Sequence, residues 1–381
     1  MQRIRIMKSA CMIGLLFISL TNCSKNDIKN PARQDGFETG SFKEAGIDEA
    51  SIINLEKEIQ AGKYNIHSVL ILKGNKLIYE HYFPGDDAVF PDPVGVIDHN
   101  RDSLHDCRSL TKSLVSACVG IAMEQGRIHS LEDKIFNYFP AYIKYATGKR
   151  ATITIRDLLT MSAGFEWNEN TPYTDTLNDE INMSVKPDVV DYVLSKPMVH
   201  TPGTVWNYSG GCTQLLAELI KNATGLRVDS FAKTYLFGPL GITKYNWYVR
   251  PSLTPEGGEV VWAPSGLRMR SIDLAKIGTL YLNNGIYNGN AILSEKWVEQ
   301  SLHWQINTDG VSEGYGFQFW CTQPLIAKGY TNVAMADGNG GQRICMIPSK
   351  SVIIVLTAGN YDEAGSISDD LLTNVFFPAI H

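Results

Sequence analysis

The sequence lacks a basic stretch, a membrane-spanning apolar segment and a high content of charge. Charged residues make up 19% of the 381 residues, and the formal net charge is -6. Proteins that bind nucleic acid carry clusters of basic residues, whereas this chain is mildly acidic and has no basic run. We therefore expect no nucleic-acid partner. The 44% of hydrophobic residues can supply a large core, and the chain length favours two or three structural units.

Motifs for metals and disulfides are also missing. Beyond Cys23 the cysteines are widely spaced, odd in number and without a C-x-x-C pair, so they describe neither a disulfide framework nor a zinc site and are expected to be buried apolar residues. The histidines before the last residue, His381, show no ligand spacing, so the sequence predicts no metal; they are His67, His81, His99, His105, His129, His200 and His303.

The N-terminus has the layout of a bacterial export signal. Basic residues precede the apolar run 11–20, which is too short to span a bilayer as a mature helix. The following L-T-N-C is similar to a lipoprotein cleavage box. We therefore predict a signal peptide over residues 1–22, acylation of Cys23, and a tether over residues 23–45. The protein is then an exported lipoprotein of the cell envelope, held at the membrane by its lipid; an ordinary secretion signal is the alternative.

Hydrophobic periodicity predicts an α+β protein. The predicted strands are 66–72, 77–83, 315–320, 342–347 and 352–357. Gly74-Asn75 is a hairpin signal between the first two strands. Residues 84–103, rich in Pro, Gly and Asp, are expected to form a loop, and helical spacing dominates residues 104–248.

These elements indicate one sheet built from both ends of the chain. We predict an antiparallel sheet flanked by helices, formed by residues 46–103 and 264–381, with a mainly helical domain, residues 104–263, inserted between them. A cleft between the two units is the expected site. The long segment from Phe165 to Pro187 is a candidate rim of that cleft.

The clearest chemical signal is a serine and a lysine one helical turn apart. Ser109 and Lys112 stand at the start of an apolar helix, which places a hydroxyl beside an amine at the edge of a core. A serine must lose its proton as it attacks, and a lysine can accept that proton only if desolvation or a nearby cation lowers its pKa. The same S-x-x-K pattern recurs at Ser230 and Lys233, and the pattern alone does not separate the copies.

Several motifs, in order, resemble those of a known superfamily. The segments are S-L-T-K (109–112), I-R-D-L-L-T-M-S-A-G (155–164), W-N-Y-S-G-G (206–211) and G-N-G-G-Q (338–342). They are similar to motifs of the serine β-lactamases and penicillin-binding proteins. Within this superfamily the chain resembles the class C-like branch, and most of all 6-aminohexanoate-dimer hydrolase-like and esterase-like serine hydrolases. The resemblance runs from about Gly46 to the C-terminus and implies a β-lactamase/transpeptidase-like fold.

The resemblance separates the two S-x-x-K copies and adds a third residue. It implies that Ser109 is the nucleophile and Lys112 its partner, because Ser230 lies where the family has an ordinary helix. Tyr208 takes the first position of the family motif Tyr-x-Asn, where a phenol can share the proton of Ser109 and pass it to the leaving group. Whether Lys112 or Tyr208 is the primary base stays open at this point.

Two departures from the family motifs affect the expected substrate. Gly210 stands where Tyr-x-Asn has its asparagine, and Ala336-Asp337-Gly338 maps onto the third motif without the usual cation. Because Asp337 would repel an anionic ligand, we expect a neutral or cationic amide or ester rather than a β-lactam. Arg343 could compensate only through a shift along the strand.

Substrate contacts are expected from a glycine-rich strand edge and from one loop tyrosine. A tetrahedral intermediate needs two N–H donors, expected from Ser109 and from the segment with Gly338, Asn339 and Gly340. The resemblance also implies that Tyr173 contacts the substrate, with anchoring of the long loop as its alternative role.

The sequence thus predicts an envelope-anchored serine hydrolase that forms an acyl-enzyme on Ser109. Its expected substrate is a small-molecule or short peptide amide or ester, and the reaction needs no cofactor. Two alternatives remain: a β-lactamase or DD-peptidase that acts on cell-wall peptides, and a non-catalytic envelope binding protein of the same fold. The natural substrate and the oligomeric state are left open.

Overall fold

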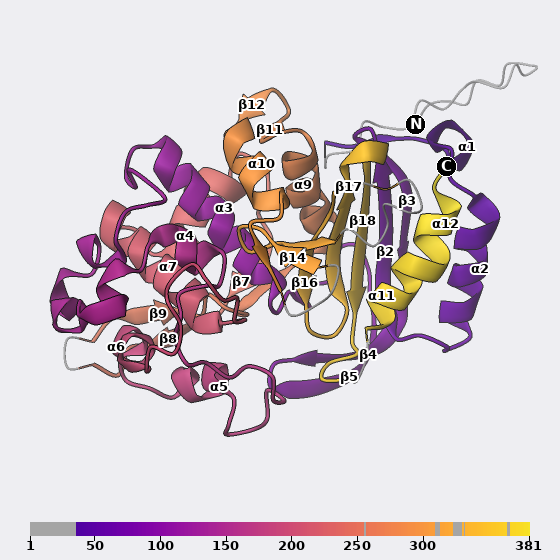
Figure 1. The fold of residues 1–381 in the computed structure, drawn as a ribbon. Helices are drawn as coiled ribbons and strands as arrows, with labels where there is room; N and C mark the ends of the chain where they lie inside the picture. The colour runs from indigo at the N-terminus through magenta and orange to yellow at the C-terminus, as the bar shows by residue number, and fades with distance from the viewer. Residues whose placement is uncertain (1–35, 255–256, 309–312, 323–329, 331, 364–365) are drawn as a thin grey trace, which may run out of the picture. The chain divides into compact units, whose positions relative to one another are not determined.

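A nine-stranded sheet built from both ends of the chain lies at the centre of the fold (Figure 1). The computed structural model describes residues 36–254, 257–308, 313–322, 330, 332–363 and 366–381. Across the sheet the strands are β1 (Glu38–Thr39), β3 (Lys76–Tyr82), β2 (Ile66–Lys73), β18 (Val352–Ala358), β17 (Gln342–Ile347), β16 (Val333–Gly338), β15 (Trp320–Thr322), β14 (Glu313–Tyr315) and β13 (Ile306–Asn307). All neighbours are antiparallel except β1 and β3. The predicted α+β fold is confirmed.

The central strands are buried on both faces because helices cover both faces. In β18, Ile353 and Val355 belong to one core while Ile354 and Leu356 belong to the other, following the two-residue period of a strand. The first core includes residues of α9 (Ser271–Leu282) and α3 (Leu110–Glu124). The second includes residues of α2 (Glu49–Gln60), α11 (Ile367–Leu371) and α12 (Phe377–Ala379), which lie together on one side of the sheet in Figure 1.

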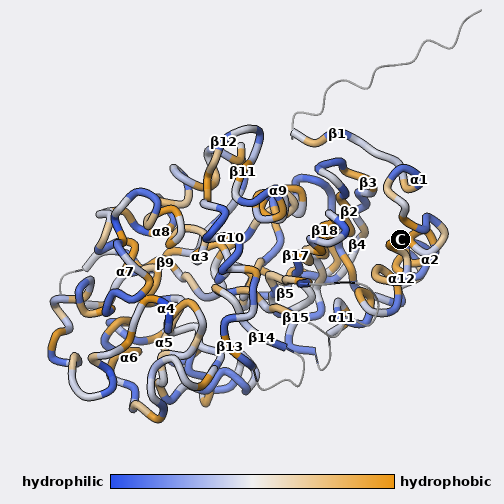
Figure 2. Tube along the Cα trace, turned by 45° about the horizontal axis from the view of Figure 1, so that its top comes forward, coloured by the Kyte–Doolittle hydropathy of each residue, from blue (hydrophilic) through white to orange (hydrophobic). Residues whose placement is uncertain are grey.

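The amphipathic helices match this two-layer arrangement. Figure 2 shows that α2 carries both hydrophobic and hydrophilic residues, as expected of a helix with one face on a sheet. By contrast, α3 is buried from Leu110 to Ala122. Other helices in the same core include α4 (Ile155–Leu159), α6 (Val189–Ser195), α7 (Gly210–Thr224) and α8 (Val228–Ala232). A helix surrounded on all sides gives Ser109, which precedes it, a rigid support.

A small three-stranded sheet leads the chain into α3. Its strands are β6 (His105–Asp106), β10 (Leu267–Met269) and β7 (Tyr245–Trp247). β6 pairs antiparallel with β10, with Arg268 opposite Asp106. Arg268 Nε also lies 2.6 Å from a carboxylate oxygen of Asp106. The segment just before the nucleophile is therefore held by both backbone pairing and an ion pair.

Two local predictions are wrong. Residues 84–103 contain a hairpin, β4 (Pro84–Val89) and β5 (Asp92–Asp98), where a loop is predicted. Since β5 is largely exposed, proline and glycine are tolerated in it and hide the strand from pattern analysis. The predicted strand at 315–320 spans the turn between β14 and β15, where Gln318 has a left-handed backbone (φ 63°) that no continuous strand accepts.

The remaining sequence predictions concern the domain division, the N-terminal signal and the cysteines. Gln34–His381 forms one compact unit, so the predicted division at residues 104 and 263 stays a prediction. The predicted signal peptide and Cys23 lie outside the described residues. None of the helices in the described part of the chain has the length and apolar character needed to cross a membrane. The five cysteines in the described ranges are free and buried, as expected of small apolar residues.

Candidate active site

Ser109 follows a sharp turn of the backbone at the start of α3. The preceding residue, Arg108, has a φ of 50°, which is uncommon for a residue with a side chain. Its guanidinium lies over the rings of Phe90 and Tyr361, at 4.2 and 4.8 Å from their centroids. These contacts hold the strained conformation in place. Ser109 is left partly exposed, whereas the helix behind it is buried.

Lys112 lies one turn along α3 and contacts Ser109 directly. Its Nζ donates hydrogen bonds to Ser109 Oγ and to the carbonyl oxygen of Pro264, both at 3.0 Å. The Lys112 side chain is 1% exposed, and its Nζ lies 4.9 Å from the centroid of the Tyr208 ring. The helical spacing of S-x-x-K therefore brings a hydroxyl and an amine into contact in a dry environment.

Tyr208 is the third sequence-predicted residue at this point. Burial raises the pKa of its phenol well above the ordinary value, the charge of Glu169 adds to the shift, and a hydrogen bond with the Ser109 hydroxyl opposes it. The phenol therefore carries its proton at neutral pH and can donate it. Ser109, Lys112 and Tyr208 lie together although almost 100 residues separate the first from the last.

Two glutamates that sequence reasoning missed lie next to Lys112. Glu169 Oε1 is 3.8 Å and Glu180 Oε2 is 3.6 Å from Lys112 Nζ, and both carboxyl groups are buried. Burial and the charge of Glu180 raise the pKa of Glu169 to about 8. Burial also acts on Glu180, but the charge of Lys112 and hydrogen bonds from Glu169 and Ser265 outweigh it and lower the pKa of Glu180. At neutral pH the pair holds one proton, on Glu169, and one charge, on Glu180.

Neighbouring donors hold the two carboxyl groups in place. Glu169 accepts hydrogen bonds from Trp167 Nε1 (2.6 Å), from the Tyr173 hydroxyl (3.2 Å) and from the backbone N–H of Gly210. Glu180 accepts a hydrogen bond from the Ser265 hydroxyl (2.6 Å). Tyr173 is thus at the site, where it donates to Glu169. Both glutamates lie in or beside the long loop that the sequence marks as a rim, but nothing in their spacing identifies them.

The carboxyl pair explains why residue 210 is glycine. A Cβ at Gly210 would lie 2.6 Å from Glu180 Oε2 and 3.2 Å from Glu169 Oε2. An asparagine in this position would require the Glu180 carboxyl group to move. The departure from Tyr-x-Asn and the two glutamates are therefore one feature: the carboxyl groups occupy the volume that an asparagine side chain would need.

The glycine-rich strand end approaches the nucleophile closely. A Cβ at Gly338, the last residue of β16, would lie 2.2 Å from the carbonyl oxygen of Cys107, so glycine is needed for this approach. Asn339 and Gly340 contact the segment after β18: Asn339 Nδ2 donates to Asp362 at 2.6 Å, and Gly340 forms a β-bridge with Asn360. Among the three predicted residues, Gly338 is the one packed against the turn that carries Ser109.

Arg343 does not act as a substitute for the missing third-motif cation. Its guanidinium donates to Asp337 at 2.7 and 2.9 Å and also contacts the carboxylate of Asp369. With 2% of its surface exposed, Arg343 is neutralised inside the protein. The same pairing balances the charge of Asp337, whose repulsion of an anionic ligand is weaker than the sequence suggests.

Aromatic rings form a wall beside Tyr208. Trp320 stacks on Tyr208 with ring centroids 5.8 Å apart, and Trp206 lies 6.1 Å from Tyr208. Tyr315 meets Trp320 edge to face at 5.3 Å. Trp206 Nε1 is buried and has no hydrogen-bond partner in the described ranges. Tyr315 and Trp320 are not predicted as site residues by the sequence, because only the folding of β14 and β15 brings them to Tyr208.

Comparison with known proteins identifies the family of the chain. The Beta-lactamase family model matches residues 53–373. The 6-aminohexanoate-dimer hydrolase of Paenarthrobacter ureafaciens is 24% identical over 303 residues, 75% of this chain and 70% of its own length. EstCE1, a hydrolase with promiscuous acyltransferase activity, has a similar structure, with a TM-score of 0.67, 15% identity, and coverage of 88% of this chain and 98% of EstCE1. The octameric penicillin-binding protein homologue from Pyrococcus abyssi has a TM-score of 0.62 at 20% identity, covering 81% of this chain and 73% of that chain. The chain belongs to the β-lactamase family of serine hydrolases.

Proposed function

We propose that the protein cleaves an amide or ester bond through an acyl-enzyme on Ser109. The observation that carries this proposal is the 3.0 Å contact between Lys112 Nζ and Ser109 Oγ. Ser109 Oγ attacks the carbonyl carbon, the C–N or C–O bond breaks, and the leaving group departs with a proton. Water then attacks the acyl-enzyme, releases the acid and restores the hydroxyl. The oxyanion is proposed to accept hydrogen bonds from the Ser109 N–H and from an N–H of the strand end after Gly338.

We propose Lys112 as the base and the carboxyl pair as the group that receives its proton. An ammonium group cannot accept a proton, so Lys112 must first lose one. The lowered pKa of Glu180 favours its ion pair with this ammonium group, so the neutral amine that faces Ser109 Oγ forms only as a minor state, by proton transfer across the 3.6 Å gap to the Glu180 carboxylate. Tyr208, whose phenol is protonated, then donates to the leaving group. In this scheme Glu180 is a positioning residue that sets the charge of Lys112.

The charges around Ser109 favour a substrate without a carboxylate near the scissile bond. Arg343 is paired with Asp337 and Asp369, and Lys112 with the carboxyl pair, so neither cation is left for an anionic ligand. The wall formed by Trp206 and Trp320 favours an apolar group on one side of the substrate. We therefore propose a neutral or cationic amide or ester, in keeping with the relative named 6-aminohexanoate-dimer hydrolase.

A covalent probe tests the nucleophile and a substrate panel tests the class. A fluorophosphonate should label the wild-type chain and fail to label the Ser109→Ala variant. The panel combines p-nitrophenyl esters, aminoacyl amides and nitrocefin on one preparation, and we expect turnover of the first two classes. Rapid nitrocefin turnover would instead identify a β-lactamase or DD-peptidase. Absence of any Ser109 adduct with several acyl probes would leave the binding-protein alternative.

We also propose that the protein is exported and anchored through an acylated Cys23. The support is the basic and apolar N-terminal pattern followed by L-T-N-C. When expressed in a Gram-negative host, the wild-type chain should fractionate with membranes and incorporate a labelled fatty acid. The Cys23→Ala variant should lose the label. Equal labelling of both proteins would contradict the proposal.

A further inference from the structure

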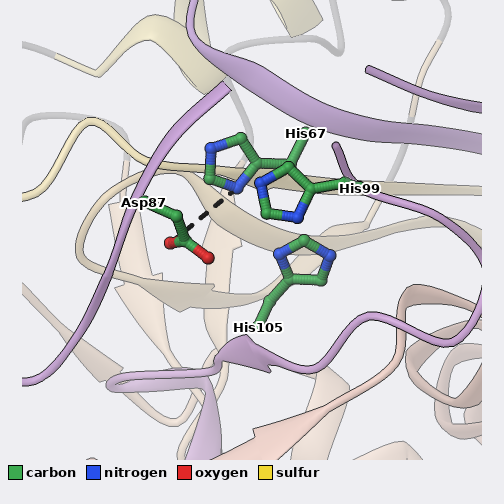
Figure 3. A group of neighbouring side chains, drawn as sticks. All are labelled: His67, Asp87, His99 and His105. Atoms are coloured by element: carbon green, nitrogen blue, oxygen red, sulfur yellow. Dashed lines mark ion pairs between the residues drawn. The ribbon is translucent and has the colours of Figure 1, made fainter. Parts of the chain in front are cut away.

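Three histidines and an aspartate meet in a buried cluster outside the candidate active site (Figure 3). His67 lies on β2, Asp87 on β4, His99 just after β5, and His105 on β6. Their exposed fractions are 0%, 7%, 5% and 1%. Each residue can offer one ligand atom such that all four atoms lie within 4.8 Å of one another. Four elements thus converge on a single point with four donor groups.

The hydrogen bonds of His67 fix which of its nitrogens faces the cluster. His67 Nε2 lies 3.0 Å from the backbone oxygen of Asp86, and because a carbonyl can only accept, Nε2 carries the proton. In the neutral ring, Nδ1 then presents a bare lone pair toward the Asp87 carboxylate, 4.0 Å away. Two acceptors that face each other repel unless a cation or a proton lies between them. The gap between His67 and Asp87 therefore suits a positive ion.

The other two rings leave their nitrogens without partners. Neither nitrogen of His99 or of His105 makes a hydrogen bond of ordinary geometry within the described ranges; the His99 ring lies close to the Gly85 carbonyl. The rings of His67 and His99 stack with centroids 3.9 Å apart, and those of His99 and His105 are tilted with centroids 4.8 Å apart; these contacts cover the ring faces but leave the nitrogens without partners. Buried polar atoms without partners are costly, so such a group is expected to have a ligand.

We infer that His67, Asp87, His99 and His105 bind a divalent transition metal, with zinc as the best match to three imidazoles and one carboxylate. Tetrahedral zinc with bonds of about 2.0–2.1 Å needs ligand atoms about 3.4 Å apart, so the cluster must contract by no more than about 1.4 Å. Because all four positions come from buried protein groups, the site is structural rather than catalytic.

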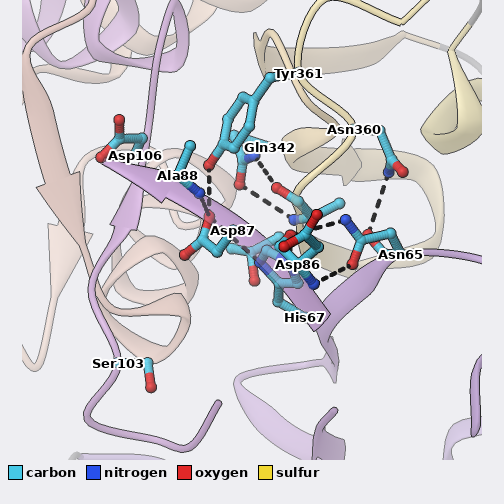
Figure 4. A network of polar contacts seen from close by, with 12 residues as sticks. Asn65, His67, Asp86, Asp87, Ala88, Ser103, Asp106, Gln342, Asn360 and Tyr361 are labelled. Carbon is cyan, nitrogen blue, oxygen red and sulfur yellow. Dashed lines mark hydrogen bonds and ion pairs between the residues drawn. The ribbon is translucent and has the colours of Figure 1, made fainter. Parts of the chain in front are cut away.

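The surroundings orient the ligands in the way that metal sites require. The Asp86 carbonyl accepts from the second nitrogen of His67, and the Tyr361 hydroxyl donates to Asp87 Oδ1 at 3.0 Å (Figure 4). Small residues make room for the His67 ring: a Cβ at Gly85 would lie 2.7 Å from His67 Cδ2, and one at Gly359 would lie 2.8 Å from its Nε2.

The position of the cluster indicates its role. His105 stands four residues before Ser109, on the strand that carries the chain into the nucleophile turn. Tyr361, which donates to Asp87, also covers the guanidinium of Arg108. A metal at this point would join β2, the β4–β5 hairpin and β6, and would brace the backbone before the nucleophile without touching the substrate.

Metal analysis of the full chain, purified without a histidine tag, tests this inference. Elemental analysis should find about one zinc ion per chain in the wild type and in His81→Ala, and less than about one tenth of that in His99→Ala. His81 is a matched control because it also stacks on an aromatic ring, Phe83, and faces a carboxylate, Glu56, but belongs to no cluster. Equal metal content in all three proteins, or no metal in any after incubation with zinc, would overturn the inference.

Reconstitution covers the case in which His99→Ala does not fold. Metal-free wild type, prepared with a chelator, should take up Co²⁺ with a visible absorption spectrum typical of tetrahedral N/O coordination, and its melting temperature should rise on metal addition. Tyr361→Phe, which removes only the hydroxyl that orients Asp87, should weaken metal affinity about 10- to 100-fold. An absent cobalt spectrum in wild type, or an unchanged affinity together with an unchanged melting temperature, counts against the site.

Discussion

The carboxyl pair beside Lys112 makes a quantitative prediction about pH. Glu169 has an ordinary pKa of 4.5 when unfolded and a pKa of about 8 when folded, because burial and Glu180 oppose its ionisation. Between these values the folded protein keeps a proton that the unfolded chain releases. The free energy of unfolding therefore falls as pH rises, by about 1.4 kcal/mol per pH unit, and levels off above about pH 8.

Replacing Glu169 by glutamine removes this titration and keeps a similar shape and hydrogen-bonding capacity. Between about pH 5.5 and about pH 7.5 the wild type should lose about 3 kcal/mol through this group, whereas Glu169→Gln should not. The stability difference between the two proteins should therefore shift by about 3 kcal/mol in favour of the variant. Taking this difference cancels the contributions of the buried histidines, which titrate in both proteins.

Glu180→Gln should behave differently because it removes the charged member of the pair. Loss of one partner of a buried ion pair costs about 3–5 kcal/mol, and part of this is recovered because Glu169 can then ionise and face Lys112. Urea unfolding followed by tryptophan fluorescence at several pH values measures both variants. Glu58→Gln, at a partly exposed surface residue paired with Lys63, is the control. A Glu169→Gln variant that keeps the wild-type pH slope would refute the assignment of the proton to Glu169.

Three further predictions concern the same site. Gly210→Asn, which restores the family residue, should destabilise the protein by about 1–3 kcal/mol because the new side chain meets Glu180 and Glu169. A lowered urea midpoint of unfolding would show this loss. An unchanged midpoint with full activity would mean that the carboxyl pair moves freely. Tyr208→Phe should lower kcat for amide substrates about 10²- to 10⁴-fold while Ser109 still reacts with a fluorophosphonate; an equal loss for esters with very good leaving groups would argue against a role as the acid. Trp320→Ala should raise KM for substrates with an apolar acyl group more than it lowers kcat, and equal changes for polar and apolar acyl groups would exclude a substrate contact.

Much of the scaffold could be predicted from local pattern. The strands near residues 66–72 and 77–83 and the turn Gly74-Asn75 match β2, β3 and the left-handed backbone between them, because apolar runs and turn residues act over short distances. The β4–β5 hairpin was hidden because an exposed edge tolerates proline and glycine. The strand predicted at 315–320 is a turn because a single left-handed residue, Gln318, reverses the chain.

The sequence by itself determined the contact between Ser109 and Lys112, since residues three apart on a helix lie on one face and a buried helix supports them. It also determined the family, through motifs that occur in a fixed order. Only the tertiary structure decided what surrounds that contact. Glu169 and Glu180 reach Lys112, and His67, Asp87, His99 and His105 reach one another, through long-range packing that leaves no periodic trace in the chain. A charge or a lone pair is shifted by whichever groups the fold places within a few ångströms, and sequence spacing does not encode those distances.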